Sequence, residues 1–165
     1  MMSPKRWQDS ASETAQVVLP NDSNPLGYIL GGTVMHMIDI TGAIACHRHT
    51  NALALTAGVD SLDFLHPIKV GDIIILKSRV TATFRTSLEV EVEVFSEVIT
   101  SGERKLTSRA YLTFVSLDEQ GEPKAVAPLL IETPEDQERQ RRAQARRSER
   151  LARKTKGAAT ESPRP

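Results

Sequence analysis

The chain has 165 residues, which suits one folded domain with a tail, and equal numbers of basic and acidic residues give it no formal net charge. A neutral balance indicates no electrostatic preference for nucleic acid or another highly charged partner. The single cysteine, Cys46, excludes an intrachain disulfide and a cysteine-rich zinc site. The first residues contain no apolar signal segment and no run approaches the roughly 18 apolar residues of a membrane span, so we expect a cytoplasmic location.

The composition changes sharply near Pro134. Beyond it stand ten basic and five acidic residues, with one leucine as the only large aliphatic side chain. We therefore expect three parts: a flexible N-terminus at 1–12, a folded domain at 13–133 and a charged, partly helical or disordered tail at 134–165.

Helix propensity favours a helix over about 135–155, whereas 154–165 has the composition of a disordered segment. The helix would lack an apolar stripe, so we expect little to hold it against the domain. A solubilising or oligomer-edge role for this tail is favoured over contact with RNA or membrane lipid.

In chain order, the sequence predicts one strand, a long apolar helix and four further strands. They cover residues 13–19, 31–49, 57–65, 72–84, 87–98 and 105–117. The clearest strand, 87–98, alternates apolar side chains with the acids Glu89, Glu91 and Glu93. Because side chains alternate between the two faces of a strand, we interpret this acidic row as a solvated face.

The helix at 31–49 has apolar residues on more than one side, which is typical of a buried helix. Long antiparallel strands that are apolar on one side need an apolar element laid across them. The expected class is therefore α+β, a long antiparallel sheet wrapped around one central helix.

Asp39 is the most informative polar residue, since it stands in mid-helix between Ile38 and Ile40. A carboxylate there costs several kcal/mol unless it is hydrogen-bonded or reaches water. It is either a structural acid paired with a buried donor or a general base or nucleophile at the floor of a pocket.

The loop before the helix offers a second candidate region, with Asn24 followed by Gly31 and Gly32. These residue types form turns, and the glycines could simply let the helix approach the sheet. Alternatively, unpaired backbone N–H groups at the helix start would stabilise an oxyanion. Asp39 follows Gly32 by seven residues, about two helical turns, so it can lie on the same side as the helix start.

The histidines show no metal-ligand spacing, so we expect no metal site. His36 lies one turn before Asp39 and is either a core histidine or a base. His66 precedes Pro67 in a loop and has no partner that the sequence identifies. Cys46 is interpreted as a small core residue.

Four segments together resemble the hotdog-fold acyl-CoA thioesterase (acyl-CoA hydrolase) family. They are NDSNPLGYILGGTVMHMIDITGAIACHRHT, DFLHPIKVGD, RTSLEVEVEVFSE and SGERKLTSRAYLTFVSLDEQGEPKAV. The resemblance runs from about residue 17 to 133 with the segments in the family's order. It implies hydrolysis of acyl-CoA thioesters to fatty acid and CoA, without metal or bound cofactor.

In that family an asparagine of the pre-helix loop and an aspartate of the central helix work together, which places the roles on Asn24 and Asp39. The resemblance implies that each site takes Asn24 from one protomer and Asp39 from its partner. It further implies a homo-oligomer built from a dimer of hotdogs, commonly a trimer of dimers.

Phosphate groups of CoA would suit basic residues in two turns. The first turn holds Arg85, Thr86 and Ser87, where the family usually has a glycine before Thr-Ser; the second holds Arg104 and Lys105. Two alternatives to hydrolysis remain: an acyl-CoA-binding regulatory module without turnover, and a hydroxyacyl-thioester dehydratase that would use His36 with Asp39.

Overall fold

The structure is a computed structural model that describes residues 1–160; residues 161–165, the end of the stretch expected to be disordered, lie outside the described part. Trp7–Asp9 and Pro20–Asp22 form short 3-10 helices, and the long helices are α1 (Gly31–Thr50) and α2 (Pro134–Thr160). The strands are β1 (Ser12–Val17), β2 (Leu53–Phe64), β3 (Ile73–Thr83), β4 (Ser87–Glu97) and β5 (Arg104–Leu117).

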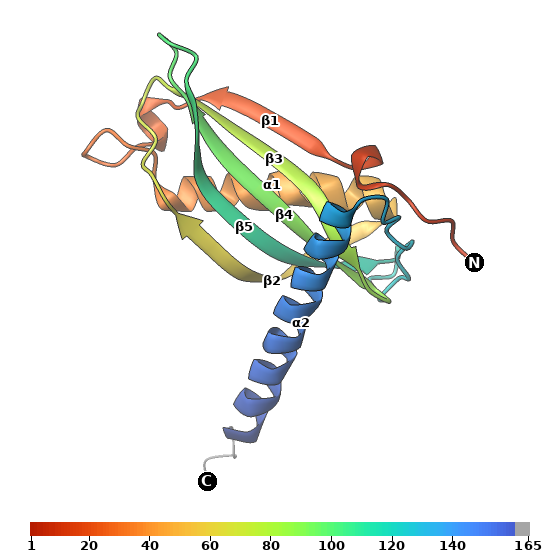
Figure 1. Ribbon diagram of the computed structural model, residues 1–165. Coiled ribbons are helices and arrows are strands. Elements are labelled where there is room, and N and C mark those ends of the chain that lie inside the picture. The colour runs from red at the N-terminus through yellow and green to blue at the C-terminus, as the bar shows by residue number, and fades with distance from the viewer. Residues whose placement is uncertain (161–165) are drawn as a thin grey trace.

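All five strands form one antiparallel sheet in the spatial order β1-β3-β4-β5-β2. Helix α1 crosses one face of this sheet and α2 lies against the other (Figure 1). The expected order of one strand, a long helix and four strands is confirmed. The strand expected from residue 57 begins earlier, at Leu53, because Asn51 adopts a left-handed conformation (φ 49°) that turns the chain directly out of α1.

The core lies between α1 and the sheet. Val92 of β4 is fully buried, and α1 buries Ile38 and Ala45 against the same layer. At Gly42 a Cβ atom would stand 3.3 Å from the ring of Phe114, so a larger residue would press on that ring, and glycine lets the middle of the helix approach the sheet closely.

The opposite side of α1 is open, which corrects the expectation of a helix buried all round. Met35 is 48% exposed and Ile40 is 46% exposed. The neighbouring edge strand β2 adds further exposed apolar side chains, namely Leu53, Leu55, Val59 and Phe64. We call this open side of α1 together with β2 the α1–β2 face.

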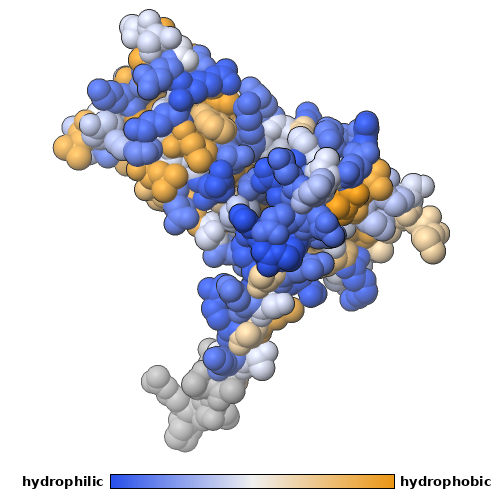
Figure 2. Space-filling view, in the orientation of Figure 1, coloured by the Kyte–Doolittle hydropathy of each residue, from blue (hydrophilic) through white to orange (hydrophobic). Residues whose placement is uncertain are grey.

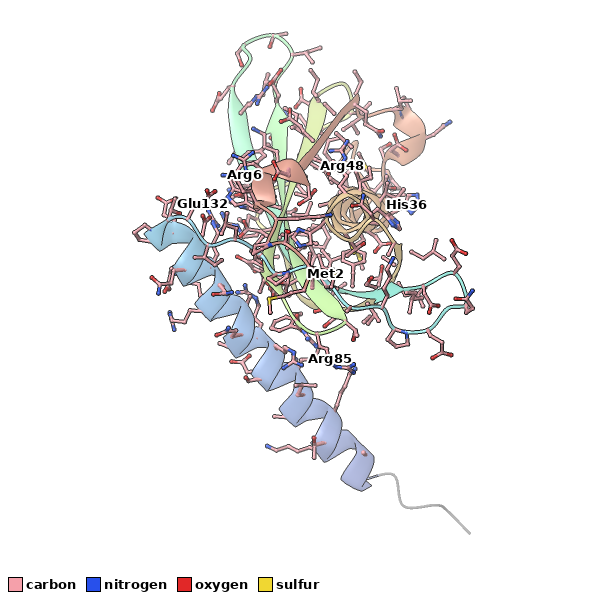
Figure 3. The ribbon with its side chains drawn as sticks, turned by 90° about the vertical axis from the view of Figure 1, so that its right-hand side faces the viewer. Met2, Arg6, His36, Arg48, Arg85 and Glu132 are labelled. Atoms are coloured by element: carbon pink, nitrogen blue, oxygen red, sulfur yellow. The ribbon has the colours of Figure 1, made fainter. Side chains whose placement is uncertain are left out.

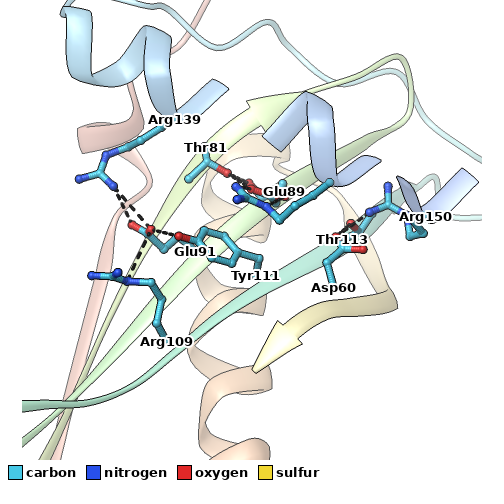
Figure 4. Close-up of polar contacts among 10 residues, drawn as sticks. Asp60, Thr81, Glu89, Glu91, Arg109, Tyr111, Thr113, Arg139 and Arg150 are labelled. Atoms are coloured by element: carbon cyan, nitrogen blue, oxygen red, sulfur yellow. Dashed lines mark hydrogen bonds and ion pairs between the residues drawn. The ribbon is translucent and has the colours of Figure 1, made fainter. Parts of the chain in front are cut away.

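The sequence had suggested that the acidic row of β4 is a solvated face, and the structure shows that this is wrong for Glu89 and Glu91. Glu89 is 1% exposed and Glu91 is 3% exposed, because α2 covers them. Arg146 donates to both carboxylate oxygens of Glu89 at 2.8 and 2.9 Å, and Arg139 donates to Glu91 at 3.2 Å (Figure 4). Glu93, farther along the strand, pairs with Arg109 at 2.9 Å.

Helix α2 is therefore held by charge rather than by an apolar stripe, which corrects the expectation that little would hold it. Arg139, Arg146 and Arg150 share one face of the helix, and Arg150 donates to Asp60 of β2 at 2.6 Å. Ala143 lies among them, fully buried. Hydrophilic side chains cover much of this side of the molecule (Figure 2). Neither α2 nor any other described helix is apolar enough to cross a membrane.

The stretch at 1–12 makes several contacts with the domain. Backbone hydrogen bonds join Lys5 to Pro128 and Leu130, at 2.9 and 2.8 Å. The ring of Trp7 lies under the guanidinium of Arg79, 3.6 Å from the ring centroid. These contacts place the N-terminal segment beside the connection that leads from β5 to α2.

Candidate active site

Asn24 sits in a tight loop between the second 3-10 helix and α1. Its side-chain oxygen Oδ1 accepts hydrogen bonds from the backbone N–H groups of Leu26 and Tyr28, at 3.0 and 3.2 Å. Its own backbone N–H donates to the Tyr28 carbonyl at 2.8 Å. Because this hydrogen-bond pattern requires the oxygen to face the loop, the side-chain NH₂ is left without a partner among residues 1–160.

Asp39 lies half-buried in the middle of α1, as the sequence placed it. The hydroxyl of Thr56, on β2, donates to Asp39 Oδ1 at 2.6 Å. The second oxygen, Oδ2, has no hydrogen-bond partner among the described residues. Thr56 was missed by sequence reasoning, because its contact with Asp39 spans 17 residues and no local pattern marks it.

The start of α1 carries the expected pair of free backbone donors. No side chain caps this helix, and the amides of Gly31 and Gly32 have no acceptor in the part of the chain that the structure describes. A Cβ at Gly32 would meet open space, so the close approach to the sheet belongs to Gly42 and not to these two glycines. The Phe64 ring packs against Gly31, 3.6 Å from where a Cβ would lie.

One pocket, about 270 Å³ in volume, joins the Asn24 loop to the start of α1. Asn24 and Gly31 both line it, together with residues from the end of β2 and the loop that follows. Asp39 does not line this pocket. A single chain therefore does not gather the two main candidates around one cavity.

The five candidates for CoA binding fall into two groups at opposite ends of β4. Ser87 pairs with Val115 at one end of the β4–β5 ladder, whereas Glu97 pairs with Arg104 at the other. The two ends of this eleven-residue strand are about 33 Å apart at the usual rise per residue. The turn with Arg85 and Thr86 therefore cannot serve the same phosphate as Arg104 and Lys105 within one protomer.

The remaining reactive side chains of the sequence analysis take other positions. His36 is exposed on the side of α1 that faces away from the sheet (Figure 3), and it makes no hydrogen bond with Asp39. Cys46 is fully buried, and burial raises the pKa of its thiol to about 12, so it is a neutral core residue. Within residues 1–160, no three His, Cys, Asp or Glu side chains are grouped so that they could hold a metal ion.

Comparison with known proteins places this arrangement in a family. Residues 26–103 match the model of the thioesterase superfamily. A Bacillus subtilis protein named as an uncharacterised acyl-CoA thioester hydrolase is 40% identical over 119 residues, which cover 72% of this chain and 69% of that protein. The chain belongs to the acyl-CoA thioester hydrolase family.

This membership confirms the expected class of enzyme, a thioester hydrolase. The human cytosolic acyl coenzyme A thioester hydrolase is 35% identical over 147 residues, which cover 84% of this chain. The match spans only 39% of that longer human protein.

Solved structures confirm the hotdog architecture. A hexameric acyl-CoA thioesterase, 39% identical, superposes with a TM-score of 0.88 and covers 92% of this chain and 97% of its own. An acyl-CoA hydrolase variant from Staphylococcus aureus in complex with coenzyme A is 32% identical, with a TM-score of 0.90 over 97% of this chain and 96% of its own.

The Staphylococcus aureus structures include three single alanine variants, at an asparagine, an aspartate and a threonine. In that protein the aspartate follows the asparagine by 15 positions and the threonine follows the aspartate by 17. Asn24, Asp39 and Thr56 have the same spacing in this thioester hydrolase.

Proposed function

We propose that this thioesterase hydrolyses acyl-CoA to a free fatty acid and CoA, with Asp39 as the general base or nucleophile. The observation that carries the proposal is the Asp39–Thr56 pair: the Thr56 hydroxyl donates to Asp39 Oδ1 at 2.6 Å, and Oδ2 has no hydrogen-bond partner within residues 1–160. This pair lies among the exposed apolar side chains of the α1–β2 face, where burying a carboxylate is costly unless it is hydrogen-bonded or hydrated. Asn24, Asp39 and Thr56 are separated by the same intervals as the three residues substituted in the Staphylococcus aureus protein, which supports the same assignment.

The proposed site is completed by a second copy of the chain. The α1–β2 face exposes apolar side chains, and β2 lies at the edge of the sheet. A two-fold partner would bury this face, continue the sheet across the interface and bring its own Asn24 pocket to Asp39. The hexameric relative supports a trimer of such dimers.

Asn24 of the partner subunit would act as a hydrogen-bond donor to the substrate. Its Oδ1 is committed to two backbone N–H groups, so only its NH₂ can reach the thioester. A donor suits the carbonyl oxygen, which becomes negative when the carbonyl carbon is attacked. The free amides of Gly31 and Gly32 would add to this oxyanion site.

Asp39 would act on the attacking water, or attack the carbonyl directly to form an anhydride. Thr56 fixes Oδ1, which leaves Oδ2 to accept the proton or to serve as the nucleophile. The reaction would need no cofactor, since CoA is part of the substrate. We propose that the CoA phosphates bind either to the turn at 85–87 or to Arg104 and Lys105. A site between two protomers could also take one of these groups from each.

A cytoplasmic location is part of the proposal and is supported by the cytosolic human relative. The regulatory-module alternative predicts tight acyl-CoA binding without turnover. The dehydratase alternative predicts release of a crotonyl product from a 3-hydroxyacyl-CoA, and the absence of a hydrogen bond between His36 and Asp39 gives it no support.

The test is release of free thiol from acyl-CoAs of increasing chain length by the wild type and by Asp39→Ala and Asp39→Asn. We expect kcat to fall at least about 100-fold in both variants, a typical general-base contribution. Circular dichroism and size-exclusion chromatography would check that the variants keep their fold. Glu149→Gln, which removes an exposed charge on α2, serves as the control and should retain turnover. Near-normal hydrolysis by a folded Asp39→Ala protein would refute the assignment.

A further inference from the structure

His66 is a histidine at the candidate site that the proposed mechanism leaves without a role. It lies two residues after the end of β2 and precedes Pro67. The Thr107 carbonyl accepts the backbone N–H groups of Leu65 and His66, at 2.7 and 3.4 Å, which ties this segment to β5. The imidazole is exposed, and neither ring nitrogen has a hydrogen-bond partner within the described residues. The backbone is thus fixed while the ring remains available.

The ring lines the same pocket as Asn24 and Gly31. Most of the other lining residues are apolar: Ile29, Val34, Phe64, Leu65, Pro67 and Ile68. The pocket lining contains no carboxylate, and its titratable side chains are His66 and the phenol of Tyr28. His36 does not line it. Imidazole is the side chain that enzymes use most often to transfer protons, which makes His66 the candidate proton donor of this pocket.

Thioester hydrolysis creates a need for such a proton. The free donors of Asn24 and Gly31 would stabilise the oxyanion, and Asp39 would remove a proton from water. Neither of these roles protonates the sulfur when the C–S bond breaks. An alkyl thiol has a pKa of about 8.5, so at neutral pH its sulfur leaves more readily when a proton is delivered to it.

We infer that His66, beside Asn24 in the same protomer, is the general acid that protonates the departing sulfur of CoA. When the tetrahedral intermediate collapses, the carbonyl re-forms and the C–S bonding pair moves to sulfur. The sulfur takes the proton from the protonated imidazole, and CoA leaves as the thiol. The proton that Asp39 took from water returns through solvent to His66, so one water is consumed and both groups are restored. This inference rests on the proposed acyl-CoA hydrolysis.

The test compares two leaving groups on the same acyl chain, CoA and an aryl thiol such as 4-nitrothiophenol. An aryl thiolate is a much weaker base and leaves without protonation. We expect His66→Gln to lower kcat on acyl-CoA about 100-fold, the low end of a general-acid contribution, while the aryl thioester is hydrolysed nearly as fast as by the wild type. Glu149→Gln, an exposed residue of α2 outside both the pocket and the α1–β2 face, is the control and should leave both rates unchanged.

Rescue by free imidazole gives a second readout that does not depend on the aryl substrate. The pocket is open to solvent beside His66, so imidazole should restore acyl-CoA turnover to His66→Gly and should not raise the turnover of the wild type. The inference is overturned if His66→Gln retains its kcat on acyl-CoA, if it loses both substrates equally, or if imidazole fails to rescue His66→Gly. It is also overturned if Tyr28→Phe, instead of His66→Gln, shows the leaving-group-dependent loss. Absence of turnover in the wild type would instead refute the proposed function itself.

Discussion

At the scale of single residues, the side chain of Asn24 has two chemically different ends that the loop keeps apart. The oxygen closes the turn by accepting hydrogen bonds from the Leu26 and Tyr28 amides, and the NH₂ group is the end that would contact the proposed substrate. Asp39 shows the same division, since the Thr56 hydroxyl donates to one oxygen and the other has no partner in the described part of the chain. The loop holds one polar atom of Asn24 and β2 holds one polar atom of Asp39, and in each residue this orients the second polar atom.

The variant Asn24→Asp tests the two ends of this side chain separately. Aspartate keeps the oxygen that accepts the Leu26 and Tyr28 amides, so the turn and the fold should survive, but it cannot donate to the thioester oxygen. We expect kcat to fall about 100-fold or more, as when one oxyanion donor is removed. Steady-state kinetics with one good acyl-CoA substrate would measure this.

Asn24→Ser is the companion variant, because serine can both close the turn and donate a hydrogen bond. It should retain more activity than Asn24→Asp. If the aspartate variant were as active as the wild type, Asn24 would act only as a turn former.

At the scale of secondary-structure elements, α2 packs through arginines where most surface helices use leucine or isoleucine. Arg139, Ala143, Arg146 and Arg150 follow the spacing of one helical face. The carboxylates beneath them belong to β4 and β2, and the Arg146 guanidinium also stacks on the ring of Tyr111, 3.7 Å from its centroid. Burial and the neighbouring Glu91 carboxylate raise the pKa of Tyr111 to about 12, so its phenol stays protonated and donates to Glu91.

Removing one partner of a buried ion pair should cost more than removing an exposed charge of the same helix. In Arg146→Gln, the carboxylate of Glu89 loses its bidentate partner and keeps only the Thr81 hydroxyl, so we expect a loss of about 3 kcal/mol in the free energy of unfolding. Arg142→Gln, whose side chain is 64% exposed, should change stability by less than about 0.5 kcal/mol. Urea denaturation monitored by circular dichroism would measure both values.

The double variant Glu89→Gln with Arg146→Gln should recover part of this loss, because it leaves no unpaired buried charge. Equal stabilities of Arg146→Gln and Arg142→Gln would show that charge does not hold α2 on the sheet.

At the scale of the whole molecule, one chain holds the two halves of the proposed site apart from each other. The Asn24 pocket does not include Asp39, and Asp39 lies on the apolar α1–β2 face. A two-fold dimer would place the halves of two chains together. Activity would then depend on the pairing of protomers as well as on the residues of each protomer.

Mixing two inactive variants tests this pairing. Asn24→Ala and Asp39→Ala proteins, each nearly inactive alone, should regain about a quarter of the wild-type activity when co-expressed in equal amounts, since half of the random dimers are mixed and each of those has one intact site. Thiol release per protomer, measured on the purified mixture, would show it. If both residues served a site within their own protomer, the mixture would stay as inactive as its parts.

The sequence by itself determined the parts of the fold that depend on local periodicity. The alternation around Val92 located β4, and the apolar run around Ile38 located α1 and isolated Asp39 within it. Local patterns carry this information because they report which positions face an apolar layer. The family segments then paired Asn24 with Asp39, although nothing in their spacing alone required it.

Only the tertiary structure decided which distant polar groups meet. Thr56 reaches Asp39 because β2 returns alongside α1, and Glu89 is buried because Arg146, 57 residues later, lies over it. The same chain path separates Arg85 from Arg104, two turns that looked equivalent in the sequence. An alternating acidic row has the same pattern whether water or arginines cover it. The free energy of burying those charges depends on a partner that the strand itself does not encode.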